Sequence, residues 1–248
     1  MKAFLTMSVT EFRLSIRNFV YMFFAFVFPP MMLLLFGAMY GNDPTPFYNG
    51  RGAVDVLTPG YIGMILAVSG IMGLPMQLAE YRQHKVLKRF KATPISTGTI
   101  MIPHFVVNSV LCIIGTLILM IVGKLVFNLH FSGNIFYFMA TYVLSMMSIF
   151  SIGFLIAAIA PNNRAASAIA YLVYFPMLFL SGAMMPLQLM PKAIVNISRF
   201  MPLTYCVEIL QKTWAGDPLS ASFGTAIIIL AAISIVCTVV SIKIFRWE

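Results

Sequence analysis

The charged residues of this chain are concentrated in one short stretch, EYRQHKVLKRFKATPIS, which begins at position 80. One acidic and five basic residues lie within twelve positions: Glu80, Arg82, Lys85, Lys88, Arg89 and Lys91. Arg82, Lys85 and Arg89 share one face of a helix, since residues three and four apart are neighbours there. Val86, Leu87 and Phe90 supply an apolar side, and Pro94 ends the helix. The chemistry open to such a segment is ionic contact with another surface.

Two interpretations of this stretch stay open from the residues alone. A basic loop between apolar segments is attracted to anionic lipid headgroups. Setting the orientation of a membrane protein needs only a few charges, however, and this stretch has more. A compact amphipathic helix ended by a proline is better suited to docking on a protein surface, and we favour that interpretation.

No arrangement for catalysis or metal binding is found elsewhere in the sequence. The phosphate-loop motif G-x-x-x-x-G-K-[ST] is absent, because Gly123-Lys124 is followed by Leu125. The histidines (84, 104, 130) and cysteines (112, 206, 237) are too scattered to predict a metal site or a disulfide framework. The apolar segments contain no pair of acidic residues, which ion-coupled pumps and intramembrane proteases generally need. We therefore expect no catalytic residue, metal or cofactor here, and an energy source in another protein.

The composition predicts an all-α membrane protein with a single transmembrane domain over residues 1–248. Only 9% of the residues are charged and the mean hydropathy is +0.94, whereas soluble proteins have about 25% charged residues. About 20 apolar residues in a helix cross the hydrocarbon core. Six such spans are predicted, over residues 18–40, 57–78, 101–127, 134–160, 166–186 and 222–243. Pro29-Pro30 should kink the first span.

Two segments outside the spans are predicted to be amphipathic helices at the membrane surface. In residues 1–17 apolar and polar residues each recur at helical spacing, which favours a helix lying in the interface over a plain charged leader. Residues 187–213 are too short and too polar to span, and they include Pro191 and Pro202. We expect one or two short helices there, on or in the outer leaflet.

The distribution of basic residues predicts the orientation. Eleven of the sixteen lysine and arginine residues fall in residues 1–17, the 79–100 loop, the 161–165 turn and the tail after the sixth span. The positive-inside rule then places both termini and the 79–100 loop in the cytoplasm. The net charge of +9 is accounted for by these loops, so we expect no nucleic-acid partner.

The first two spans carry patterns with more than one explanation. Gly63 and Ala67, and Ser69 and Gly73, form small-xxx-small pairs in the second span. Such pairs serve close packing within one subunit as well as dimerisation. Phe24, Phe28 and Met31 lie on one stripe of the first span, where they either line an adaptable substrate path or face lipid and core.

Three motifs together resemble the membrane subunit, or permease, of small bacterial type-2 ATP-binding-cassette (ABC) exporters. They are EYRQHKVLKRFKATPIS from position 80, VDVLTPGYIGM at 54–64, and LSGAMMPLQLMPKAIVNISRFMPLTYCVEILQ at 180–211. In order they are similar to the family's charged cytoplasmic motif, its acidic and Pro-Gly opening of span 2, and its broken span 5 with proline-flanked outer helices. The chain departs from the family at His84-Lys85, where a glycine is usual.

The resemblance implies that residues 80–96 form a coupling segment seated on a separate ATPase subunit that binds ATP and Mg. Glu80, Arg82, Lys85, Lys88 and Arg89 would make the polar contacts, and Pro94 would fix the exit into the third span. Two ATPase copies would drive two permease copies, as a homodimer or a related heterodimer, in the cell membrane.

The resemblance also implies a path between the two permeases, formed mainly by spans 1, 2 and 5 and capped by residues 187–213. The expected path residues are Phe24, Phe28, Met31, Tyr61, Met64, Tyr174 and Phe175, and the expected outer gate is Ser181, Gly182, Pro186, Pro202 and Tyr205. The cargo would be hydrophobic or amphipathic, such as a drug, an antimicrobial peptide or a lipid-like molecule. The alternatives are a secondary transporter driven by an ion gradient and, more remotely, a membrane enzyme.

Overall fold

The computed structural model describes residues 2–48, 50–84, 97–217 and 221–244. The regular secondary structure within these ranges is helical. One isolated β-bridge joins Thr45 and Arg51. Six helices among the described residues are long and apolar enough to cross a membrane, which confirms the predicted all-α membrane fold. They are α2–η1–α3 (Phe19–Tyr40), α4–η3–α5 (Ala53–Gln83), α7 (Thr97–Phe127), α8 (Ile135–Ile159), α9 (Asn163–Leu180) and α12 (Ala221–Ile244).

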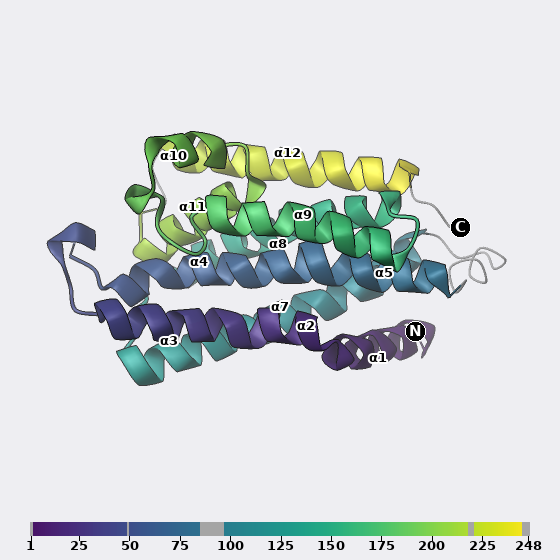
Figure 1. The fold of residues 1–248 in the computed structure, drawn as a ribbon, viewed down its shortest axis with the longest axis horizontal. Helices are drawn as coiled ribbons and strands as arrows, with labels where there is room; N and C mark the ends of the chain where they lie inside the picture. The colour runs from purple at the N-terminus through teal and green to yellow at the C-terminus, as the bar shows by residue number, and fades with distance from the viewer. Residues whose placement is uncertain (1, 49, 85–96, 218–220, 245–248) are drawn as a thin grey trace.

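The spans lie alongside one another in a bundle, and the start of α1 and the end of α12 lie at the same side of it (Figure 1). We call this the terminal side; it holds α1 (Lys2–Arg17), the end of α5 and the 160–162 turn. The opposite side, the loop side, holds the connections 41–52, 128–134 and 181–201.

The second span, α4–η3–α5, is the centre of the bundle. Its most apolar window is 89% buried, whereas that of α12 is 17% buried. Small residues permit this close packing: a Cβ at Gly63 would meet Val207, and one at Gly153 of α8 would come within 1.8 Å of the Gly70 carbonyl oxygen. The small residues of the second span therefore serve packing within the chain.

The first and second spans both contain a π-helical segment. These are η1 (Phe23–Val27) in the first and η3 (Val68–Gly73) in the second. Pro29 and Pro30 directly follow the first residue of α3 (Phe28–Tyr40), in its first turn, where a missing N–H is tolerated. Such π segments are often found at functional sites.

The predicted bounds of two spans are wrong. The second span begins at Ala53 and continues to Gln83, beyond the predicted 57–78. The fifth span ends at Leu180, not 186, because Gly182 follows with a left-handed φ of 82°. The remaining four agree with the predicted ranges to within a residue or two.

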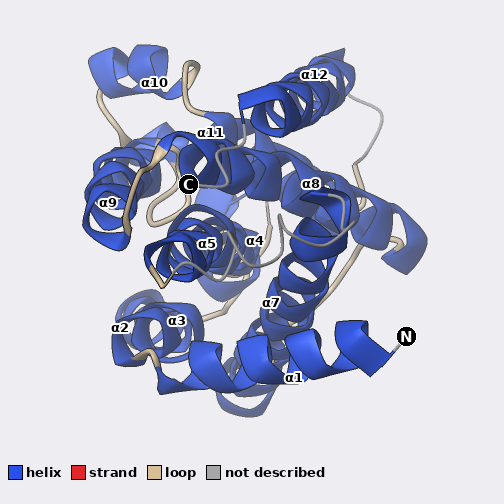
Figure 2. Cartoon of the chain, turned by 90° about the vertical axis from the view of Figure 1, so that its right-hand side faces the viewer, coloured by secondary structure: helices blue, strands red, loops and turns tan. Residues whose placement is uncertain are grey.

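The predicted amphipathic segments are both helical. Figure 2 shows α1 lying across the ends of the spans, where it packs against α7. Val9 and Ile16 of α1 are about half exposed, while Glu11 and Ser15 are buried. On the loop side, α10 (Lys192–Ser198) and α11 (Pro202–Ala215) meet at 97°. One face of α11 is buried against α4, α8 and α12.

Candidate functional site

The lead-in to the predicted coupling segment is anchored by Arg82. This arginine is 5% exposed, and its Nη1 donates to the Ala157 oxygen at 2.9 Å and to the Ala160 oxygen. These carbonyls lie at the C-terminal end of α8, where the helix has unpaired acceptors and partial negative charge. Arg82 therefore ties the end of α5 to the turn between α8 and α9.

The other predicted coupling residues divide into two groups. Glu80 is exposed on α5, one turn before the helix ends at Gln83. Lys85, Lys88, Arg89 and Pro94 lie outside the described residues. Close packing beside these residues allows Arg82 to reach the end of α8, because the small side chains of Ala79, Ala160 and Ala166 form a separate buried cluster between α5 and the start of α9.

Polar side chains from α1, α5 and α7 meet in a buried cluster on the terminal side. His104 Nδ1 lies 3.1 Å from Glu11 Oε2, within ion-pair distance although not at hydrogen-bond angles, and both side chains are fully buried. The same nitrogen lies 3.4 Å from Gln77 Oε1. Gln77 in turn donates to Ser15 Oγ at 2.8 Å and accepts from Asn108 at 3.0 Å.

The cluster continues into the first two spans through Tyr21. Its hydroxyl donates to Ser69 Oγ at 3.1 Å, inside the π-helical η3, and to Asn108 Oδ1 at 3.4 Å. Four residues of the cluster form two pairs, each with a spacing of four residues on one helix: Glu11 with Ser15, and His104 with Asn108. We call the seven residues the polar network: Glu11, Ser15, Tyr21, Ser69, Gln77, His104 and Asn108.

The polar network was missed by sequence reasoning, which treated the acidic residues as surface groups and His104 as isolated. The i, i+4 spacing of the two pairs was the available signal. A groove of about 530 Å³ opens beside the network, between α1, α2, α5 and α9. Its lining includes Glu11, Arg17, Glu80 and Asn163.

The predicted path residues fall into an outer and an inner group. The rings of Phe24 and Phe28 are 5.3 Å apart, and Phe24 lies 6.4 Å from Phe175 of α9. These three side chains are partly exposed, as is Met31 at 40%. Tyr61, Met64 and Tyr174 are completely buried within the chain. The structure thus brings the first and fifth spans together at an aromatic contact.

The predicted gate residues lie at turns on the loop side. Ser181 caps α9 and its Oγ accepts from Ala183 N at 3.3 Å, while Gly182 adopts the left-handed conformation. Pro186 precedes a short 3₁₀ helix, η4 (Leu187–Leu189). Pro202 starts α11, and the Tyr205 hydroxyl donates to the Arg199 oxygen at 2.7 Å.

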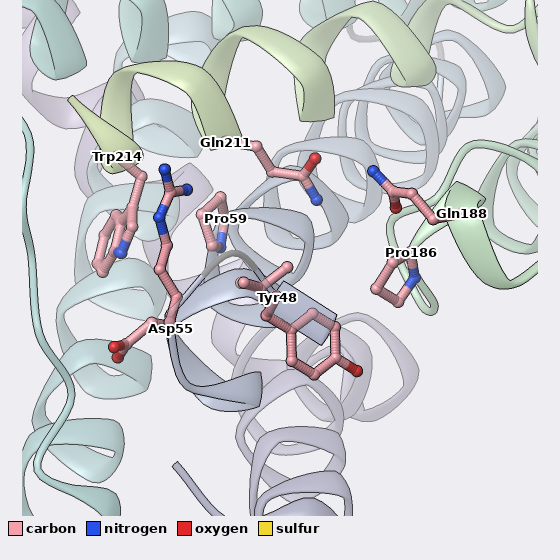
Figure 3. Close-up of a pocket in the computed structure, with 9 residues that line it drawn as sticks. Tyr48, Asp55, Pro59, Pro186, Gln188, Gln211 and Trp214 are labelled. Atoms are coloured by element: carbon pink, nitrogen blue, oxygen red, sulfur yellow. The ribbon is translucent and has the colours of Figure 1, made fainter. Parts of the chain in front are cut away.

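Two adjoining cavities lie among these turns. The smaller, of about 170 Å³, is lined by the residues drawn in Figure 3, including Tyr48, Asp55, Pro59, Pro186 and Trp214. The larger, of about 430 Å³, is lined in part by Ser181 and Gly182. Arg51, Gln188 and Gln211 line both cavities. Both sides therefore offer polar space: two cavities on the loop side, and the groove beside the buried network on the terminal side.

These features define an all-α, multi-pass membrane protein with polar sites at the two ends of one buried span. The chain belongs to the ABC-2 type transporter family, whose model matches residues 2–214. The resemblance to the membrane subunits of type-2 ABC transporters is thereby confirmed.

Similar proteins include three with informative names. ABC transporter G family member 20 of Dictyostelium discoideum is 27% identical over 168 residues, which are 67% of this chain and 22% of that protein. The probable multidrug ABC transporter permease YbhR of Escherichia coli is 22% identical over 161 residues, 65% of this chain and 44% of its own length. Nodulation protein J of Rhizobium leguminosarum is 36% identical over 70 residues, 28% of this chain and 27% of that protein. The chain thus spans less than half the length of each of these relatives.

Proposed function

We propose that this chain is the permease subunit of an ABC exporter and moves a hydrophobic or amphipathic substrate outward. ATP hydrolysis takes place in a separate ATPase subunit, and the permease itself is not an enzyme. The observation that carries the proposal is the family match over residues 2–214. The multidrug permease name of one relative supports the same role and cargo class.

In this proposal the terminal side faces the cytoplasm, with both chain termini, and the permease lies in the cell membrane. The basic residues that support this orientation include Arg17 and Arg82. Residues 80–96 contact the ATPase through Glu80, Lys85, Lys88 and Arg89, and Pro94 fixes the exit. Arg82 acts as an anchor instead of a contact, since its guanidinium is held by the end of α8. Movement of the coupling segment is thereby transmitted to α8 and α9.

Two copies of the permease form the substrate path between them, and two ATPases drive it. The partly exposed aromatic surface of Phe24, Phe28 and Phe175, with Met31 nearby, suits an apolar cargo. Tyr61, Met64 and Tyr174 lie beneath this surface and reach the path only when the helices separate. The turns from Ser181 to Tyr205 form the outer gate.

Co-purification of the tagged permease tests the coupling role. We expect a protein with a phosphate loop to accompany the wild-type chain. The triple variant Lys85→Glu, Lys88→Glu, Arg89→Glu should lose this partner and its permease-stimulated ATPase activity while remaining folded. A matched triple variant on the loop side, Lys124→Glu, Lys192→Glu, Arg199→Glu, removes the same charge and should keep the partner. Retention by the first variant would contradict the docking role.

One observation favours the second candidate, an ion-driven secondary transporter. Glu11 and His104 are ionisable groups buried together beside a groove, an arrangement that sequence reasoning took to be missing. Buried acidic groups of this kind mark proton relays in pumps and transporters. Substrate accumulation that follows an imposed pH gradient without ATP would favour this candidate over the exporter.

A further inference from the structure

We propose that the two loop-side cavities form a binding site for an acidic head group, a phosphate or carboxylate, held by Arg51. The cavities of about 170 and 430 Å³ share Arg51, Gln188 and Gln211. This inference adds a binding site to the proposed function. Only the statement that the bound ligand is the transported cargo rests on the exporter proposal. Binding itself needs neither ATPase nor nucleotide, so the two proposals can fail separately.

The backbone around Arg51 is fixed by the loop that carries it. Thr45 N donates to the Arg51 oxygen at 3.1 Å, and Arg51 N donates to the Tyr48 oxygen at 3.2 Å. Gly50 adopts a φ of 77° and donates to the Thr45 oxygen at 2.9 Å, which closes the turn. The loop therefore presents Arg51 at a defined place, between α4 and the turns of the gate.

The guanidinium of Arg51 has no counter-ion in the described part of the chain. The described residues give this side chain no hydrogen bond or ion pair. Asp55, the nearest acidic residue in sequence, is occupied elsewhere. Its Oδ1 accepts from Asn42 Nδ2 at 3.0 Å and from His130 N at 2.9 Å. In Figure 3 the Asp55 carboxylate points away from the space between Gln188 and Gln211.

The other charged groups of the larger cavity are partly neutralised. Lys212 Nζ lies 2.8 Å from Glu208 Oε1, so these two charges compensate one another, and Asp217 is the remaining acidic residue of this lining. Tyr48 supplies no negative charge near neutral pH, because a phenol has a pKa of about 10, and partial burial and the neighbouring Tyr40 raise the pKa of this one further. The smaller cavity is thus lined by two charged groups, the guanidinium of Arg51 and the carboxylate of Asp55, of which only Asp55 has hydrogen-bond partners among the described residues.

The residues around Arg51 suit an amphipathic anion. An arginine fork binds carboxylate and phosphate oxygens through two parallel N–H donors. The side-chain amides of Gln188 and Gln211 face the same space in Figure 3 and supply further donors. Pro59, Pro186 and Trp214 provide apolar wall for an attached chain.

Fluorescence of Trp214, which lines the smaller cavity, provides the test. The chain contains two tryptophans, so Trp247→Phe leaves Trp214 as the sole reporter. The permease in phosphatidylcholine nanodiscs is titrated with dodecyl phosphate and, separately, with dodecyltrimethylammonium. We expect saturable binding of the phosphate and at least tenfold weaker binding of the cation. Arg51→Gln should weaken phosphate binding about ten- to a hundredfold, since a charged hydrogen bond is lost.

Arg164→Gln, in the first turn of α9, removes the same charge from the terminal side and should leave binding unchanged. If Arg51→Gln fails to fold, the double variant Gln188→Leu, Gln211→Leu decides, with at least about fivefold weaker binding expected. The proposal would be overturned by any of three results: Trp214 fluorescence that does not change saturably, equal affinity for the phosphate and the cation, or variants that bind the phosphate as the wild type does. Repeating the titration in phosphatidylglycerol nanodiscs identifies the natural source of the acidic group. Weaker binding of dodecyl phosphate there indicates competition by a lipid head group, and unchanged affinity indicates that the site binds a free amphiphile.

Discussion

The two sides of the bundle use polar residues in opposite ways. On the terminal side, seven polar side chains from α1, α2, η3, α5 and α7 contact one another beside a groove of about 530 Å³. On the loop side, polar side chains line open cavities, and Arg51 faces them without a counter-ion among the described residues. Buried polar groups that satisfy one another make a region rigid, and in the network the hydrogen bonds of Tyr21, Gln77 and Asn108 do this. We infer that the terminal side transmits movement as a unit and that the loop side receives a ligand.

The largest effect is expected where the polar network is broken at the buried contact between Glu11 and His104. His104→Leu leaves the fully buried Glu11 carboxylate without its partner, which costs about 3–5 kcal/mol of unfolding free energy. The denaturation midpoint of the detergent-solubilised permease measures it. The double variant Glu11→Leu, His104→Leu should recover most of the loss, because both groups are then apolar. Equal losses in the single and double variants would contradict a specific pair.

Removing the Arg82 anchor should have the next largest effect. Arg82→Met deletes the donors to the carbonyls of Ala157 and Ala160, a loss of about 1.5–3 kcal/mol for charged hydrogen bonds. Hydrogen exchange should quicken in residues 79–84 and 157–163. Glu80→Gln, an exposed neighbour, is the control and should change stability by less than about 0.5 kcal/mol. Equal hydrogen-exchange rates in Arg82→Met and Glu80→Gln would show that Arg82 does not anchor the end of α5 to α8.

A smaller effect is expected at the junction of the polar network with the π-helical segment of the second span. Tyr21→Phe removes the hydroxyl that joins Ser69 to Asn108, and a neutral hydrogen bond contributes about 0.5–1.5 kcal/mol. Thermal unfolding measures the change. Tyr137→Phe removes an exposed hydroxyl and should be silent; a similar change in both would show that the network ends before Tyr21.

The smallest effect is expected at the exposed ion pair of the loop side. Glu208→Gln breaks a contact of 2.8 Å whose side chains are 32% and 21% exposed, and such pairs contribute about 0–1 kcal/mol. The loss should disappear in 1 M salt, where the screening length falls to about 3 Å. A loss comparable to that of His104→Leu would remove the contrast between the two sides.

The fold class could be predicted because its signal lies in long runs of residues. Six apolar segments and the basic loops between them determine an all-α membrane bundle without knowledge of any contact. The end of the fifth span was predicted too late, because the apolar character continues past Leu180 while one backbone angle, at Gly182, ends the helix. Hydropathy contains no information on that angle.

The sites were less predictable because they combine side chains from several helices. Nothing in the basic stretch distinguishes Arg82, which turns back onto α8, from its neighbours. Glu11 was interpreted as part of a surface helix, yet the crossing of α1 over α7 brings it to His104. Arg51 was counted only for orientation, and its cavity depends on α11 and the gate turns.

Transport by inside-out membrane vesicles tests the central claim most directly. The permease and its ATPase are co-expressed, and uptake of a fluorescent amphiphile is followed with ATP in the presence of a protonophore. We expect uptake to continue without a proton gradient and to stop when ATP is replaced by a non-hydrolysable analogue. ATP-driven export would be contradicted if an imposed pH gradient drove uptake without ATP and if Glu11→Gln abolished that uptake.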